Sequence, residues 1–190
     1  MSNFINLSRG VSKFNGGEYD GFVIVKLDWS IKDKILAADS NVVRERAGYC
    51  QIKSVGVNEG QETGYLLVTM LGGRIDGIEM THAAPPEDLK DLVELKFSQP
   101  EVDAYLEAVQ DTNPIHKGEG AIVPGGMIIA ALQDKVAETK AWFTEPEAKF
   151  TAHFIAPVDV GEKFKIGQNK AGLWVHNERL GECIKITKKI

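Results

Sequence analysis

The residues most able to do chemistry lie in one short stretch, DTNPIH, at positions 111–116. Asp111 and His116 are too far apart in sequence to share one face of a helix, but they can converge across a loop that Pro114 bends. Such a pair can divide proton transfer, with one group polarising a water molecule and the other exchanging a proton with a substrate carbon or oxygen. Histidine suits this work because small changes in its surroundings move its charge through neutral pH. The pattern indicates Asp111 and His116 as candidate acid and base.

The same spacing has a purely structural interpretation, in which Asp111 caps a turn and His116 is an ordinary loop histidine. Gly125 and Gly126 favour the chemical interpretation, because they precede an apolar, helix-like run that begins at Met127. Backbone N–H groups at a helix start are unpaired and lie at the positive end of the helix dipole. They could hold an oxyanion such as a thioester enolate. The alternative for this pair is a plain Gly-Gly turn that allows tight packing.

A helix is expected on each side of this loop. Residues 100–109 follow Ser98, with Glu101 three positions later and Pro100 near the first helical position, which is a capping-box pattern. Residues 127–137 are apolar on most sides, as is typical of a buried helix. Four strand-like segments follow, at residues 148–156, 162–168, 173–176 and 182–188. One buried helix followed by an antiparallel meander predicts an α+β fold.

The first part of the chain is expected to be rich in strands. Residues 1–18 are polar and contain several glycines, which indicates a partly ordered lead-in. Residues 31–46 have no clear period, so they are assigned either a short helix around 32–39 or an irregular connection. Strands are predicted at residues 21–29, 49–57, 65–71 and 74–80, with a hairpin loop at 58–61.

The paired prolines in residues 82–89 break regular structure and mark the best candidate for a boundary. They divide the chain into a strand-rich N-terminal region, residues 1–85, and a second domain, residues 86–190.

The composition excludes some classes of function. The chain has 190 residues, of which 43% are hydrophobic, and a net charge of −5. This is ordinary for a globular protein with a real core. The negative charge argues against nucleic acid as the main partner, since phosphate binding needs a basic face. Cys50 and Cys183 make no metal or redox spacing, and no histidine pair has metal-ligand spacing, so no metal is expected. With no signal peptide and no membrane-spanning run, we expect a cytoplasmic protein without membrane partners.

Residues 105–116 (YLEAVQDTNPIH) resemble the hydratase-2 motif of MaoC-like dehydratases and (R)-specific enoyl-CoA hydratases. In that family the motif is roughly Tyr, a few residues, Ser/Thr-Gly-Asp, any residue, Asn-Pro-Ile/Leu-His; here Val109 and Gln110 stand in place of Ser/Thr-Gly. A glycine–methionine helix start follows, matched by Gly126 and Met127. Residues 150–161 (FTAHFIAPVDVG) resemble the family's next strand, with its Pro-Val-x-Val-Gly turn. The resemblance covers roughly residues 91–190.

The resemblance implies the hot dog fold, in which an antiparallel sheet wraps around a long helix. Family members add water to trans-2-enoyl thioesters of CoA or acyl carrier protein, giving (R)-3-hydroxyacyl thioesters, or run the reverse. It implies that Asp111 and His116 act on the water, that Asn113 shapes the loop, and that the amide of Gly126 faces the thioester carbonyl. The neighbouring Gly125 and Met127 complete the expected substrate site, and no cofactor is implied.

Residues 1–85 match no pattern of this kind, so they could be a degenerate second hot dog domain or an added cap. Hot dog domains usually pair so that two sheets become continuous. We therefore expect a homodimer or an internal pairing of the two halves, with acyl-CoA or acyl-carrier-protein thioesters as substrates. Two other functions remain open, a non-catalytic acyl-thioester binding protein and a hot dog thioesterase.

Overall fold

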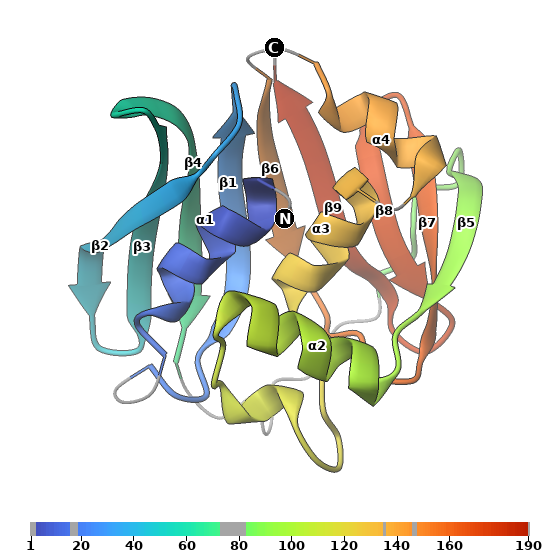
Figure 1. Ribbon diagram of the computed structural model, residues 1–190. Coiled ribbons are helices and arrows are strands. Elements are labelled where there is room, and N and C mark those ends of the chain that lie inside the picture. Colours follow the sequence, from blue (N-terminus) through green and yellow to red (C-terminus); the bar gives the residue numbers. More distant parts are fainter. Residues whose placement is uncertain (1–2, 16–18, 73–82, 135, 146–147, 190) are drawn as a thin grey trace.

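The frame of the molecule is one antiparallel sheet of nine strands, in the order β2-β3-β4-β1-β6-β9-β8-β7-β5 (Figure 1). The computed structural model describes residues 3–15, 19–72, 83–134, 136–145 and 148–189. The strands are β1 Val23–Ile31, β2 Ala37–Arg46, β3 Tyr49–Asn58, β4 Gln61–Leu71, β5 Lys90–Lys96, β6 Lys149–Phe154, β7 Lys163–Asn169, β8 Gly172–Asn177 and β9 Gly181–Lys189. The helices are α1 Asn3–Ser12, α2 Gln99–Val109, the short 3-10 helix η1 Pro114–His116, α3 Gly125–Asp134 and α4 Ala137–Phe143. Helices α1 and α3 lie on the same side of the curved sheet (Figure 1).

Strand β1 joins the two parts of the chain, because it pairs with β4 on one side and with β6 on the other. Trp29 on β1 lies opposite Phe150 on β6, and the two rings stack at 5.4 Å between centroids. Both side chains are buried, so the joint between the parts is a packed aromatic contact as well as a ladder of hydrogen bonds. Strands β1–β4 precede residue 85 and β5–β9 follow it. Because all share one sheet, the division into two domains at that residue stays a prediction.

Helix α1 corrects the expectation of a partly ordered lead-in. Phe4 and Leu7 are both 0% exposed, and Val11 is buried on the same face. Their spacing of three and four residues places them on one stripe of a helix, which packs against β2, β3 and β4. This apolar face is short, and the serine, asparagine and glycine residues around it lower the mean hydropathy of the segment. For this reason the composition of residues 1–18 did not indicate a helix.

The segment 31–46 is also different from both expected forms, since residues 37–46 form the edge strand β2. Most of β2 is exposed, so its sequence lacks the alternation of apolar and polar residues by which a half-buried strand is recognised. The predicted hairpin at 58–61 is confirmed. Glu59 and Gly60 have positive φ angles of 49° and 80°, as a two-residue hairpin turn with matching strand twist requires. The strand expected at 74–80 lies outside the described residues.

The second part follows the prediction closely. The carboxylate of Glu101 accepts a hydrogen bond of 2.8 Å from the N–H of Ser98, which confirms the capping box at the start of α2. The buried helix expected over 127–137 is present as α3, followed by the separate short helix α4. All four predicted strands are present as β6, β7, β8 and β9, and together with α3 they confirm the α+β class. No helix in the described part of the chain has both the length and the apolar character to cross a membrane.

Candidate functional site

The loop after α2 is shaped by the residue that ends the helix. Gln110 adopts the left-handed conformation, with φ 61° and ψ 37°, and the N–H of Asp111 donates to the carbonyl of Leu106 at 2.9 Å. This closing turn satisfies one of the last carbonyls of the helix and directs the chain away from the helix axis. Asp111 therefore lies beyond the end of α2, in the loop that leads to η1.

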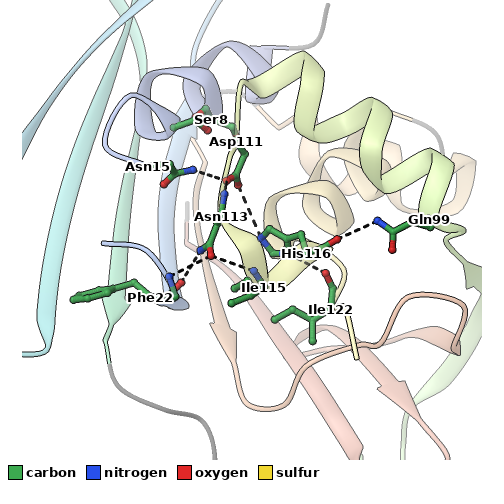
Figure 2. Close-up of polar contacts among 11 residues, drawn as sticks. Ser8, Asn15, Phe22, Gln99, Asp111, Asn113, Ile115, His116 and Ile122 are labelled. Atoms are coloured by element: carbon green, nitrogen blue, oxygen red, sulfur yellow. Dashed lines mark hydrogen bonds and ion pairs between the residues drawn. The ribbon is translucent and has the colours of Figure 1, made fainter. Parts of the chain in front are cut away.

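Asp111 and His116 converge as the sequence suggested. Nε2 of His116 lies 3.9 Å from Oδ2 of Asp111, beyond a direct hydrogen bond but close enough for both to bind one small group (Figure 2). Nδ1 of His116 lies 2.8 Å from the carbonyl oxygen of Ile122. A carbonyl only accepts, so Nδ1 carries the proton and the neutral ring presents its Nε2 lone pair towards Asp111.

Burial controls the charge of this histidine. His116 is 7% exposed, and this burial lowers its pKa from the ordinary value. The hydrogen bond to Ile122 and the charge of Asp111 act in the opposite direction, with smaller effect. The imidazole is therefore neutral at pH 7, as a base must be to accept a proton.

Asn113 binds the loop to the first part of the chain. Its Oδ1 accepts from the N–H of Ile115 at 3.4 Å and from the N–H of Gly21 at 3.3 Å, and its Nδ2 donates to the carbonyl of Phe22 at 3.0 Å (Figure 2). Its own N–H donates to Oδ1 of Asp111 at 2.8 Å. The side chain is buried, so this set of bonds is protected from water and orders the loop around the candidate dyad.

A cavity of about 220 Å³ extends from this dyad into the space under α1. Its walls are mainly apolar and come from both parts of the chain. Helix α1 and strands β1 and β4 contribute Phe4, Val11, Leu27, Leu66, Val68 and Met70. Asp111, Asn113 and His116 supply polar groups of the same wall. The arrangement fits a ligand with a long apolar part and a reactive polar end.

The start of α3 also lines this cavity, through Gly125 and Gly126. A Cβ on Gly125 would lie 2.3 Å from the ring of Phe154, and one on Gly126 would lie 2.6 Å from the hydroxyl of Tyr105. Both positions are therefore closed to larger residues by packing, while the first N–H groups of the helix have no partner within it. Met127 does not line the cavity. Its side chain is in the core, because successive helical residues point about 100° apart.

Four polar residues of the cavity wall were missed from the sequence: Ser8, Ser12, Asn15 and Tyr105. The Tyr105 hydroxyl is hydrogen-bonded to Ser8, and burial of the ring raises the pKa of the phenol, which stays protonated. Tyr105 begins the motif, which was a usable signal. Ser8 and Asn15 lie about a hundred positions before the motif, and nothing local to them marks a site. Within the described ranges, no three His, Cys, Asp or Glu residues gather to hold a metal ion.

No family model and no curated protein sequence matches this chain. Solved structures do. HtdX from Mycobacterium tuberculosis is 14% identical, with a TM-score of 0.67 over 98% of this chain and 84% of that chain. A MaoC-like dehydratase from Phytophthora capsici is 13% identical, with a TM-score of 0.60 over 88% of this chain and 71% of that one.

An acyl-ACP thioesterase from Bacteroides thetaiotaomicron is also similar, at 10% identity and a TM-score of 0.55 over 88% of this chain and 76% of that chain. At such identities the likeness establishes the fold and leaves the reaction open. The α+β architecture predicted from the sequence is thereby confirmed in its specific form: this chain has the hot dog fold, shared by structures titled as dehydratases and as thioesterases.

Proposed function

We propose that this protein interconverts trans-2-enoyl and (R)-3-hydroxyacyl thioesters of CoA or acyl carrier protein by adding or removing water. The observation that carries the proposal is the pairing of Asp111 and His116, 3.9 Å apart, in the wall of a largely apolar cavity. A neutral imidazole and a carboxylate that face the same space suit proton transfer to and from one water molecule. The hot dog fold, shared with MaoC-like dehydratases, supports the proposal.

In the forward reaction, a water bound between Oδ2 of Asp111 and Nε2 of His116 gives its hydroxyl to carbon 3 of the enoyl group. Its remaining proton passes through the pair to carbon 2, so the pair ends in its starting state. The neutral Nε2 is the acceptor, because the hydrogen bond to Ile122 fixes the proton on Nδ1. The separation of 3.9 Å leaves both groups within reach of the same water.

The thioester carbonyl would face the start of α3. The N–H of Gly126 lies at the positive end of the helix dipole and can stabilise negative charge on that oxygen as carbon 2 gains electron density. Beyond it, the apolar cavity can take the acyl chain. Residues 1–85 supply α1, β1 and β4 to this cavity, and we propose that they are a degenerate second hot dog half rather than an added cap.

The test is loss of absorbance at the enoyl-thioester band, with crotonyl-CoA and a longer trans-2-enoyl-CoA. Asp111→Asn and His116→Ala are each expected to lower kcat by roughly 10²- to 10⁴-fold while the protein stays folded. Matched controls are Asp103→Asn and His153→Ala, which change exposed residues of the same types and should leave the rate unchanged. Full activity in both dyad variants would overturn the proposal.

A thioesterase is the second candidate, supported by the likeness to an acyl-ACP thioesterase. It predicts release of free CoA, which a thiol reagent detects in the same samples. A third outcome, tight acyl-CoA binding with no turnover and no effect of Asp111→Asn, would indicate a binding protein.

We further propose that the β1–β6 pairing within one chain takes the place of the pairing between two hot dog subunits. Light scattering should then give a monomer rather than a homodimer.

A further inference from the structure

The carboxylate of Asp111 is held by a residue from the other end of the chain. Nδ2 of Asn15 donates a hydrogen bond of 2.5 Å to Oδ1 of Asp111 (Figure 2). The backbone N–H of Asn113 donates to the same oxygen at 2.8 Å. With Oδ1 engaged by two donors, Oδ2 is the oxygen that faces Nε2 of His116. The rotation of the carboxylate, and therefore the geometry of the dyad, depends on both donors.

Asn15 is itself held in place. Its N–H donates to the carbonyl of Ser12 at 3.0 Å, in a turn that closes the end of α1. One turn earlier, Nε and Nη2 of Arg9 both donate to the carbonyl of Ala108, at 3.1 and 2.7 Å. That carbonyl is in the last turn of α2, where carbonyls lack helical partners and a positive charge is favourable. The bonds of Arg9 fix α1 against α2, the helix that ends just before Asp111, so Asn15 reaches the carboxylate from a segment that is itself held in place.

We infer that Asn15 is a positioning residue for proton transfer by Asp111, supplied by the N-terminal part of the chain. The inference rests on the proposed function of the dyad. An amide suits the role because it donates a hydrogen bond without adding charge or a titrating proton to the site. By holding Oδ1, it directs Oδ2 to the space shared with His116. Small errors in such a geometry are costly, since misplacement by about 1 Å can lower a rate by roughly a hundredfold.

A purely structural role for Asn15 would give different results. If Asn15 only tied α1 to the loop, its removal would lower the melting temperature and leave the pH dependence of turnover unchanged. A positioning residue acts on kcat with little effect on KM, and a charge placed there changes the pH profile. Among the residues that the structure describes, His116 and Tyr105 are titratable groups that act electrostatically with Asp111, and neither is replaced in the variants at position 15.

The decisive variant is Asn15→Asp, which keeps the shape of the side chain and replaces the donor by a second carboxylate. Two carboxylates in direct contact cannot both ionise easily, so the pair retains one proton to higher pH. The acidic limb of the kcat profile is expected to move up by about one pH unit or more. Carbon-13 NMR of the carboxyl groups should show proton uptake displaced by the same amount. Asn15→Ala is expected to lower kcat by roughly ten- to a hundredfold, with KM changed less than about twofold.

The matched control is Asn6→Asp, which makes the same chemical change on α1, the helix that precedes Asn15. Nδ2 of Asn6 donates to the carbonyl of Ile35 at 2.7 Å and so ties α1 to the segment before β2; this variant should lose thermal stability and keep the wild-type pH profile. If Asn15→Asp and the wild type have the same carboxyl titration and the same pH profile of kcat, the inference is overturned. Absence of turnover in the wild-type protein would instead overturn the proposed function, and the carboxyl titration would still decide whether Asn15 controls Asp111.

Discussion

Replacing Gly126 by alanine tests how tightly the start of α3 is packed against Tyr105. The φ angle of Gly126 is not in the left-handed region, so the backbone accepts alanine and the only obstacle is space. A Cβ here would lie 2.6 Å from Oη of Tyr105, whereas ordinary van der Waals contact begins at 3.4 Å. The helix and the hydroxyl must therefore separate by about 0.8 Å, the difference between these two distances.

The separation has a measurable cost, because the half-buried Tyr105 packs against the core and its hydroxyl is bonded to Ser8. Overpacking of this kind typically costs about 1–3 kcal/mol. Alanine recovers about 0.5–1 kcal/mol of helix propensity relative to glycine. We expect Gly126→Ala to lower the free energy of unfolding by about 1–2 kcal/mol and Tm by roughly 2–8 °C for a chain of this size.

The assay is a double-mutant cycle with Tyr105→Phe, in which the free energy of unfolding of each variant is measured by urea denaturation. Once the hydroxyl is removed, the nearest remaining atoms to the new Cβ are Cε1 of Phe4 and Oγ of Ser8, both at 3.7 Å. Gly126→Ala should then be neutral or stabilising in the Tyr105→Phe background, although it destabilises the wild type. An equal loss in both backgrounds would refute the argument that the Tyr105 hydroxyl determines the glycine at 126.

Two further predictions concern the same region. Burial lowers the pKa of His116 in the folded protein, so as the pH falls below about 6.5 the unfolded chain binds this proton first and the folded state loses stability. The wild type should therefore lose more unfolding free energy between pH 7 and pH 5 than the His116→Gln variant. Equal losses in the two proteins would contradict this. The backbone at position 110 is left-handed, a conformation that glycine adopts freely and a β-branched residue does not. In urea unfolding, Gln110→Gly should therefore be about 1–2 kcal/mol more stable than Gln110→Val. Equal stability of the two variants would contradict this explanation.

The second part of the chain could be predicted because its signals are local. The capping box at Ser98 and Glu101 is complete within four residues, and the apolar run of α3 is continuous over residues 126–132. Strands β6 and β7 after it alternate in burial over part of their length, and in β7 Phe164 and Ile166 face the core. Each of these features depends on neighbours in sequence, so a short window contains all the information needed.

Two elements of the first part, α1 and β2, lacked such signals, each for a different reason. The buried face of α1 consists of a few residues set among serine, asparagine and glycine, too short to give a clear period. The edge strand β2 is covered only in part: α1 packs over one of its faces, and most of its residues remain exposed. In both cases the element is stabilised by what packs against it rather than by its own pattern.

The departure of the chain from the hydratase-2 motif at Gln110 also has a structural explanation. The motif has glycine there, and the backbone of Gln110 adopts the left-handed conformation that glycine favours. The turn is kept by other interactions: the N–H of Asp111 is bonded to Leu106, and its carboxylate is held by Asn15 and Asn113. One of these partners, Asn15, comes from the N-terminal part of the chain. The left-handed turn is therefore present without a glycine, and a distant segment supplies one of the bonds that hold the loop. For the same reason, local sequence could indicate Asp111 and His116 as candidate site residues but could not reveal that Asn15 is bonded to Asp111.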